Sequence, residues 1–472
     1  MTATFPDDPF LTGWMAPFGA ECDAPDLIID GELPSDLVGT YYRNGPDPLH
    51  PPRKGDVYHW FDGDGMIQCF NIADGRVSWR NRWVKSEKFK AERKAGESLF
   101  GVFNNPMTGD PSVANVEYNT ANTHIIQHHG KLLALMEGAL PTEIEHLSLD
   151  TLGTIDFDGQ IDGPVTAHPK FDNDTGEMIF FGYSVGGPGS KTLRYNVCDK
   201  NGKLTKNVSF EAPFSAMVHD FFVTETHAIF PIFPLTTSME RAMTGGPMLA
   251  WEPDKGTHFG VIPRDGSAED VRWFNMEARF MFHMMNAWTD GSKLHADVTG
   301  SNATQFAPKL DGNMADVSDG TSPTFRRWTM DLADNTNSIS EELLDDMACE
   351  FPRIDDRLST RTYRHGYAVG SSGNGSLNFN TLIHYDTSNG QRKTYDLGDS
   401  YMVGEPVFAP RVGGTDEGDG YVIMLAYHQP TDKSELMVFQ ASAIDDGPVA
   451  TAKVPVRIPA GFHGSWVAPG AA

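Results

Sequence analysis

Short apolar runs separated by turn residues repeat along almost the whole chain. Residues 177–183 and 421–427 are two such runs, and they are rich in Ile, Val, Phe and Tyr. Turn pairs such as Asp74-Gly75 and Asn389-Gly390 recur between runs of this kind. β-Branched and aromatic residues favour strands, whereas Gly, Asn and Asp favour tight turns. The pattern therefore predicts an all-β fold built from many hairpins.

The clearest hairpin is predicted at Asn201-Gly202. Segments 193–197 and 203–205, which have a strand-like composition, flank this pair. Asn and Gly both tolerate the positive φ that tight hairpin turns require. The Gly-rich segments 186–189 and 370–375 predict loops.

Helical periodicity is scarce and local. Residues 85–94 and 338–347 are the two candidates for helices. The second has Ser338 at its start and Glu341-Glu342 in its first turn, where the helix dipole favours acidic side chains. Short helices of this kind more often cover a β fold than form a separate domain. Since no shift in composition marks a boundary, we expect one domain over residues 1–472.

The charge balance is strongly acidic, with a net charge of −27 from 64 acidic and 37 basic side chains. Such a surface repels phosphate backbones and anionic lipid head groups. We therefore expect no nucleic-acid partner. A well-solvated surface is sufficient to explain the acidity.

Cysteine spacing and the N-terminal residues indicate a cytoplasmic location. The four cysteines have no CxxC pair and no regular spacing, which favours reduced thiols over a disulfide framework or a zinc finger. The first residues lack a basic region followed by an apolar run, so no secretory signal is predicted. No run of about 18 apolar residues could span a bilayer. Peripheral contact with a membrane remains open.

Four histidines lie in short motifs with apolar residues. The motifs are Thr-Ala-His168-Pro-Lys, Val-His219-Asp-Phe-Phe, Phe-His283-Met-Met-Asn and Gly-Phe-His463-Gly-Ser-Trp. Neutral imidazole is a common metal ligand, and a ligating histidine usually donates its other ring N–H to an acceptor. These histidines are candidate metal ligands, although a single histidine in such a setting is more often structural.

Three glutamates are candidate acceptors for the histidine N–H groups. Glu137, Glu350 and Glu405 lie in apolar stretches, where an isolated carboxylate would be costly. For Glu350 and Glu405 the alternative is an ordinary ion pair with Arg353 or Arg411, which lie nearby in the sequence. The common nucleotide-binding and hydrolase motifs are absent, so those sites are not expected.

Eight motifs spread over the chain resemble one known family. They begin at Tyr42, Trp60, Asn122, Thr166, Val218, Glu350, Glu405 and Phe462 and read YRNGP, WFDGDGM, NTHII, TAHPK, VHDF, EFPRI, EPVFAPR and FHGSW. The family is that of the carotenoid cleavage oxygenases, and within it the bacterial branch that contains lignostilbene dioxygenases and isoeugenol monooxygenase. Several ordered motifs at consistent spacing make the resemblance specific.

The resemblance implies a fold and a metal centre. The implied fold is a seven-bladed β-propeller with a helical and loop cap over the active-site end. The implied metal is Fe(II) on the propeller axis, held by His168, His219, His283 and His463. The carboxylates of Glu137, Glu350 and Glu405 are expected to accept hydrogen bonds from His219, His283 and His463, in that order.

The resemblance also implies a reaction. Family members generally use O2 to cleave a conjugated C=C bond, which gives two carbonyl products. The alkene can supply the electrons, so the protein is expected to position the substrate and exclude water. Thr123 matches a family residue that crowds the open coordination position. The alternative for Thr123 is a strand threonine that hydrogen-bonds to its neighbour.

Two other functions stay open beside the dioxygenase. An isomerohydrolase of the retinoid type would use the same four-histidine iron without oxygen cleavage, and oxygen uptake would separate the two. A propeller that only binds an apolar ligand would form no product aldehyde.

The expected substrate pocket departs from the lignostilbene-type pattern. Those enzymes place a Tyr and a Lys where this chain has Phe103 and Met136, and Phe61 matches the family's stacking Phe. Phe and Met supply no partner for a phenolic hydroxyl. We therefore expect a preference for an apolar alkene, an apocarotenoid-like polyene or an unhydroxylated aryl-alkene. The alternative is stilbenoid or isoeugenol-type cleavage to an aromatic aldehyde, with Lys131 or His124 as the polar group.

Overall fold

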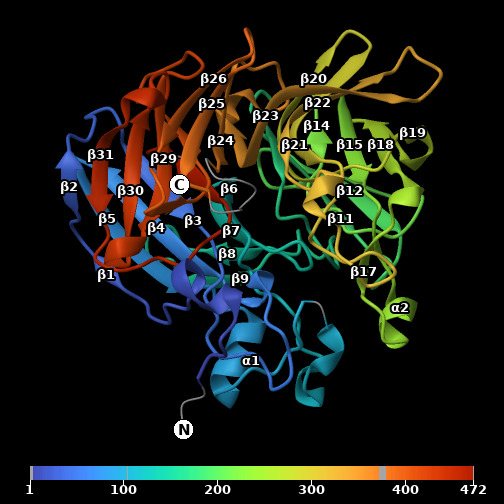
Figure 1. Cartoon of the computed structure of the whole chain (residues 1–472), viewed down its shortest axis with the longest axis horizontal. Helices are drawn as coiled ribbons and strands as arrows, with labels where there is room; N and C mark the ends of the chain where they lie inside the picture. Colours follow the sequence, from blue (N-terminus) through green and yellow to red (C-terminus); the bar gives the residue numbers. More distant parts are fainter. Residues whose placement is uncertain (1–3, 104, 372–378, 471–472) are drawn as a thin grey trace. The chain divides into compact units, whose positions relative to one another are not determined.

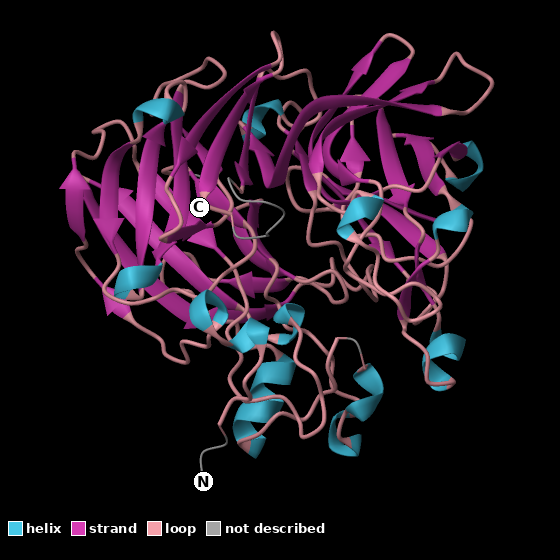
Figure 2. Ribbon diagram, viewed as in Figure 1, coloured by secondary structure: helices cyan, strands magenta, loops and turns pink. Residues whose placement is uncertain are grey.

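The computed structural model describes residues 4–103, 105–371 and 379–470. Two compact units make up the chain: unit 1 contains Met1–Ala167 and Tyr395–Ala472, and unit 2 contains His168–Thr394. Strands make up most of the ordered structure, and helices are few and short (Figures 1 and 2). The predicted all-β class is confirmed, whereas the single domain stays a prediction.

Unit 1 contains three antiparallel sheets. The first has the order β1 (Asp23–Ala24), β5 (Arg76–Trp83), β4 (Met66–Ala73), β3 (Gly39–Arg43) and β32 (Gly464–Val467). The second has the order β2 (Ile28–Gly31), β31 (Pro448–Lys453), β30 (Lys433–Gln440), β29 (Gly420–His428) and β27 (Tyr401–Val403), with β28 (Val407–Pro410) also paired to β29. The third is β6 (His124–His128), β7 (Lys131–Leu135), β8 (Thr142–Ile144) and β9 (Thr151–Thr154). The first two sheets therefore combine strands from both ends of the chain.

Unit 2 contains sheets whose strands follow one another in the sequence. The first is β10 (Lys170–Asp172), β11 (Glu177–Tyr183), β12 (Thr192–Cys198) and β13 (Leu204–Glu211). The second is β14 (Phe222–Val223), β15 (His227–Ile232), β18 (Thr257–Pro263) and β19 (Arg272–Met276), accompanied by the pair β16 (Leu235–Thr237) and β17 (Leu249–Trp251).

The largest sheet of unit 2 is built around one long strand. Its order is β20 (Phe280–Asp290), β21 (Lys293–Ser301), β22 (Thr324–Asp331), β23 (Ile339–Ile354), β24 (His365–Gly370), β25 (Thr381–Asp386) and β26 (Gln391–Asp396). The first part of β23 pairs with β22 and its last part pairs with β24. One strand thus joins two groups of four.

Most local predictions agree with the structure. Residues 177–183 form β11, and residues 421–427 lie within β29. The hairpin at Asn201-Gly202 is present, and Gly202 has the predicted positive φ, 77°. Its loop is longer than a two-residue turn and spans residues 199–203. Segment 186–189 is a loop, whereas residues 372–375 of the other predicted loop lie outside the described residues.

One predicted helix is confirmed and the other is wrong. Helix α1 (Glu87–Ala95) begins after Ser86, whose side chain accepts a hydrogen bond from Phe89 N. Residues 339–347 of this segment instead form the start of β23, where Ile339 pairs with Met330 of β22. Strand pairing overrides the local helix signal there. A second helix, α2 (Met239–Met243), is short, and no helix among the described residues is long and apolar enough to cross a membrane.

Candidate metal centre

Three histidines of unit 2 converge through their ring nitrogens. His168 lies two residues before β10, His219 lies three residues before β14, and His283 lies within β20. The Nε2 atom of His219 is 3.0 Å from that of His168 and 3.3 Å from that of His283. His168 is buried, whereas His219 and His283 are partly exposed. Unit 2 therefore brings three of the predicted ligands to one point.

A distorted part of β20 positions His283. The pairing of β20 with β21 shifts between Met281 and Met284, and again between Met284 and Asn286. Such bulges bend a strand and change the direction in which its side chains point. His283 therefore departs from the regular alternation of the ladder.

The nitrogen separations fit neighbouring ligands of one metal ion. Imidazole nitrogens bind first-row metals at about 2.0–2.1 Å, so adjacent nitrogens around an octahedral ion lie about 3 Å apart. One nitrogen from each of the three histidines lies within 4.8 Å of the others. The candidate ligands are imidazoles, and no cysteine of the described part of the chain belongs to the group.

Glu350 fixes the tautomer of His283. Its Oε2 atom accepts hydrogen bonds from Nδ1 of His283 at 2.6 Å and from the backbone N–H of Phe351 at 2.5 Å. Thr299 donates to Oε1 of the same carboxylate at 3.3 Å. Because Nδ1 of His283 donates its proton, Nε2 keeps a lone pair that faces His219.

Backbone strain accompanies this carboxylate. The register of β23 on β24 shifts between Glu350 and Arg353, and Phe351 has a positive φ of 51°. A positive φ is costly for a bulky residue and persists only where the surroundings enforce it. The bulge and the strained residue together direct Glu350 toward His283.

Unit 1 holds the fourth predicted ligand, His463, directly before β32. Its Nδ1 donates to Oε1 of Glu405 at 2.8 Å, and the backbone N–H of Gly464 donates to Oε2 at 2.8 Å. His463 is 4% exposed and Glu405 is 2% exposed. The same tautomer results as for His283, with the Nε2 lone pair left for a ligand.

Thr123 and His124 lie next to His463 in unit 1. The backbone N–H of His463 donates to the carbonyl of Thr123 at 3.1 Å, and the Thr123 hydroxyl donates to Oδ1 of Asn122 at 3.1 Å. The ring of His124 lies 5.2 Å from that of His463, and its Nδ1 donates to the carbonyl of Ala167 at 2.8 Å. The hydroxyl bond agrees with the simpler interpretation of Thr123, and its role at a metal stays a prediction.

Two of the three predicted substrate residues belong to an aromatic cluster of unit 1. The ring of Phe61 lies 5.3 Å from that of Phe103 and 5.5 Å from that of Phe462, both in edge-on geometry. Phe462 directly precedes His463, so the cluster adjoins a predicted ligand. Met136, the third residue, follows β7 and accepts a hydrogen bond at sulfur from Gly138 N at 2.9 Å.

The carboxylate of Asp62 holds this aromatic segment in place. It accepts hydrogen bonds from the backbone N–H of Phe103 at 2.6 Å and from that of His59 at 2.8 Å. Burial raises the pKa of Asp62 to about 6 and lowers the pKa of His59 to about 4. His59 is therefore neutral at pH 7, and the cluster carries no imidazolium charge.

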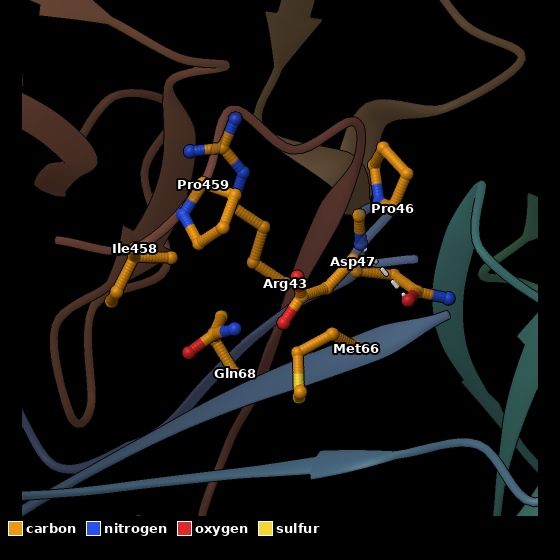
Figure 3. A pocket seen from close by; sticks show the side chains of 9 residues that line it. Arg43, Pro46, Asp47, Met66, Gln68, Ile458 and Pro459 are labelled. Carbon is orange, nitrogen blue, oxygen red and sulfur yellow. Dashed lines mark hydrogen bonds between the residues drawn. The ribbon is translucent and has the colours of Figure 1, made fainter. Parts of the chain in front are cut away.

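A small cavity of unit 1 has a buried charge in its wall. Arg43, Asp47, Met66, Gln68 and Ile458 are among its lining residues (Figure 3). Its volume is about 10 Å³, which suits a single water molecule. Arg43 is 1% exposed and donates from Nη2 to the carbonyl of Gly461 at 2.9 Å. Its Nε and Nη1 have no hydrogen-bond partner among the described residues.

Comparisons with known proteins place the chain in a family. The model of the family described as retinal pigment epithelial membrane protein matches residues 15–468. Isoeugenol monooxygenase from Pseudomonas nitroreducens is 38% identical over 472 residues, which cover 98% of each chain. The chain belongs to the carotenoid cleavage oxygenase family.

Solved structures of carotenoid cleavage oxygenases also match. The lignostilbene dioxygenase of Pseudomonas brassicacearum has a TM-score of 0.94 at 38% identity, over 99% of this chain and all of that chain. The apocarotenoid oxygenase of Synechocystis has a TM-score of 0.85 at 29% identity, over 96% of this chain and 97% of that chain. The predicted family, its seven-bladed β-propeller fold and the enzyme class, an alkene-cleaving oxygenase, are confirmed.

Within this carotenoid cleavage oxygenase, the two arginines of the alternative interpretation pair with aspartates. Arg353 contacts Asp356 at 2.9 Å, and Arg411 contacts Asp36 and Asp419 at 3.2 and 2.7 Å. The geometry thus favours orientation of histidines by Glu350 and Glu405. Glu137 is partly exposed and lies after β7, and the hydrogen bond that it is expected to accept from His219 stays a prediction.

Sequence reasoning missed two polar residues near the histidines, Lys170 and Asp220. Lys131, named as a possible pocket residue, instead pairs with Glu143 at 2.7 Å. His124 lies beside His463, and Lys170 and Asp220 contact one another at 2.6 Å. The signal for the last two was local, because each lies within a histidine motif: Lys170 ends TAHPK and Asp220 follows His219 in VHDF.

Proposed function

We propose that this protein is a non-haem Fe(II) dioxygenase that cleaves a conjugated C=C bond of an apolar alkene with O2, giving two carbonyl products. One observation carries the proposal: in a chain of this family, the Nε2 atoms of His168, His219 and His283 lie at 3.0 and 3.3 Å spacing. That spacing suits adjacent metal ligands, and because His283 donates its ring proton from Nδ1 to Glu350, its Nε2 lone pair is directed to the same point.

The donor set fits Fe(II). His463 supplies the fourth imidazole in this proposal, and Glu405 holds its ring in the ligating tautomer. Four neutral imidazoles leave the ion its full charge, and imidazole suits iron among several first-row metals. When bound, the ion supplies a site for O2 and the redox chemistry of cleavage. We assign Glu137 to His219 and the crowding of the open position to Thr123.

The protein's own residues position the alkene and exclude water. Phe61 and Phe103 present aromatic surface beside Phe462, the neighbour of His463. Aromatic rings pack edge-on or offset against other π-systems, which suits a conjugated alkene. Binding fixes the alkene in a reactive geometry, so the loss of translational and rotational entropy occurs on binding and no longer adds to the reaction barrier.

Phe103 and Met136 favour an alkene that has no 4-hydroxyl group. Such an alkene is an apocarotenoid-like polyene or an unhydroxylated aryl-alkene. Neither side chain can hydrogen-bond strongly to a phenol, and Met adapts to irregular apolar shapes. The second candidate is cleavage of a stilbenoid or an isoeugenol-type phenylpropenoid. His124 beside His463 favours it, as a polar ring near the proposed metal, and so do the names of relatives that are 38% identical.

The proposal also covers the cellular location and membrane contact of the protein. We infer a cytoplasmic location from the four free cysteines, which suit a reducing compartment. Peripheral contact with a membrane for uptake of the apolar substrate remains a prediction.

The test is turnover of a matched alkene panel under O2 by the iron-loaded full chain. Stilbene, 4-methoxystilbene, 4-hydroxystilbene, isoeugenol and an apocarotenal are followed by oxygen uptake and by mass spectrometry of the aldehydes. We expect the apocarotenal or the unhydroxylated stilbenes to react fastest. The double variant Phe103→Tyr, Met136→Lys should shift preference toward 4-hydroxystilbene.

Two outcomes count against the proposal at different levels. Fastest turnover of a phenol, with sharp loss on 4-methylation, replaces the substrate class by the second candidate. No oxygen uptake with any alkene, despite bound iron, removes the dioxygenase itself.

A further inference from the structure

A carboxylate beside the histidines joins the three backbone segments that carry them. Asp220 follows His219 and is 3% exposed. Its Oδ1 accepts hydrogen bonds from Nζ of Lys170 at 2.6 Å and from the backbone N–H of Phe221 at 2.8 Å. Its Oδ2 accepts from the backbone N–H of Met284 at 3.1 Å. One carboxylate therefore has three donors.

Each donor belongs to a segment that carries one of the histidines. Lys170 opens β10, two residues after His168. Phe221 lies two residues after His219, and Met284 directly follows His283 within the irregular part of β20. The three segments therefore meet at Asp220 as well as at the histidine nitrogens.

We propose that Asp220, together with Lys170, is a positioning group that sets the mutual spacing of His168, His219 and His283. The proposal rests on the metal centre proposed above. His168 and His219 precede their strands, so ladder pairing does not hold them directly. Charge-assisted hydrogen bonds are shorter and stronger than neutral ones, which suits them to fixing such segments.

The surroundings of Lys170 limit where its ammonium can lie. Its side chain is 16% exposed, and its Nζ lies 5.7 Å from the centre of the Phe221 ring. An ammonium over an aromatic face gains a cation–π attraction. Lys170 thus contacts Asp220 and the residue after it, which ties β10 to the His219 segment twice.

The physical consequence concerns preorganisation. If the ligand segments are fixed before the ion arrives, binding loses less conformational entropy and the ion leaves more slowly. Removal of outer partners of a metal ligand typically lowers metal affinity roughly 10- to 100-fold. Asp220 acts on backbone positions and Glu350 on a ring tautomer, so the two effects are separable.

The experiment compares four variants of the full chain: Lys170→Met, Lys170→Arg, Asp220→Asn and the control Asp297→Asn. Asp297 is a matched control because it is fully buried in the same unit and accepts hydrogen bonds from Arg327 and Tyr363. Each protein is loaded with Co²⁺ alone. The rate of Co²⁺ loss to excess chelator, the visible absorption of bound Co²⁺ and the thermal midpoint are measured.

We expect Lys170→Met and Asp220→Asn to lose Co²⁺ roughly 10- to 100-fold faster than wild type and to alter its absorption. Lys170→Arg should recover part of the retention because it keeps the charge. Asp297→Asn should lower the thermal midpoint while leaving the Co²⁺ rate unchanged. Wild-type rates in both Lys170→Met and Asp220→Asn would overturn the proposal; if Asp220→Asn fails to fold, Lys170→Met decides alone.

Crystal structures of metal-free wild type and Lys170→Met separate this inference from the proposed function. We expect the Nε2 separations among the three histidines to widen in the variant. Failure of wild type to bind metal, combined with widened separations, would remove the proposed metal centre and keep the positioning role. Unchanged separations would remove the positioning role whatever the metal does.

Discussion

Two buried carboxylates of unit 2, Asp220 and Asp297, are paired with cations, whereas two buried charged residues of unit 1, Arg43 and Asp47, have backbone groups as hydrogen-bond partners. Asp220 accepts from Lys170 at 2.6 Å, and Asp297 accepts from Arg327 at 2.7 and 2.9 Å. In unit 1, Arg43 and Asp47 line the same small cavity (Figure 3). Yet Asp47 accepts hydrogen bonds from the backbone N–H groups of residues 18 and 19 at 2.8 and 3.0 Å.

The difference matters for how each unit holds its histidines. In unit 2, paired charges connect segments that are far apart in the sequence, so three histidines depend on shared contacts. In unit 1, Glu405 binds the ring of His463 and the backbone of the next residue, so one carboxylate orients one histidine. Loss of the Lys170–Asp220 pair should therefore affect three histidines of unit 2, whereas loss of Glu405 should affect His463 alone in unit 1.

The largest effect is expected from removal of a ligand in each unit. His283→Ala and His463→Ala should each reduce bound iron from about one ion per chain to less than about one tenth of an ion per chain, because each variant leaves three of the four proposed imidazole ligands. Metal analysis of the folded proteins provides the measurement. Wild-type iron in His463→Ala would contradict the proposed ligand set and assign the metal to unit 2 alone.

The next effect concerns the carboxylates that orient the rings. Glu350→Gln and Glu405→Gln should lower iron retention or kcat roughly 10- to 100-fold, because the amide can no longer stabilise the ligating tautomer as an anion does. Glu341→Gln is the matched control, since Glu341 accepts from Arg279 and Trp328 instead. A loss of thermal stability alone, with normal iron and rate, would make Glu350 and Glu405 ordinary structural residues.

A third pair of variants compares buried charge directly. Arg327→Met leaves Asp297 buried without its cation, which should cost roughly 3 to 5 kcal/mol in the free energy of unfolding. Arg43→Met removes a buried cation whose Nε and Nη1 have no partner among the described residues, so it should be neutral or stabilising despite loss of the bond to Gly461. Denaturant midpoints measure both. Equal destabilisation would erase the contrast between the units.

Local pattern was sufficient for much of the fold. The strands at residues 177–183 and 421–427 and the helix capped by Ser86 follow from short-range signals. Segment 338–347 was misjudged because its acidic start resembles a helix terminus. In the structure Glu341 accepts hydrogen bonds from Arg279, directly before β20, and from Arg326 and Trp328 of β22. Such partners cannot be seen in a local window.

Some residues of the candidate site could likewise be predicted from short motifs, whereas others depend on how distant segments meet. The histidines and their glutamates came from motifs that resemble a known family, and the contacts of Glu350 and Glu405 agree with that assignment. The joint contact of Asp220 with Lys170 and Met284 could not be predicted, because it depends on how three separate segments meet. The bulges around His283 likewise reflect pairing between strands rather than composition.

The last effect expected is a pH dependence of stability that comes from Asp47. Burial raises the pKa of Asp47 from 3.8 to about 7 in the folded protein. Its bound proton therefore stabilises the fold at acid pH, and this contribution falls as pH rises from about 4 to about 7. Asp47→Asn carries no such penalty, so its stability relative to wild type should improve from about pH 5 to about pH 7 and then level off.

Asp386 supplies the opposite case for this measurement, because the hydrogen bond from Arg364 lowers the pKa of Asp386. Its contribution is complete above the unfolded pKa, so the difference between Asp386→Asn and wild type should stay constant over the same range. Denaturant melts of all three proteins at about pH 5, 6, 7 and 8 test both statements. A constant difference for Asp47→Asn would mean that Asp47 is ionised throughout, and that unit 1 balances this buried carboxylate as unit 2 balances its own.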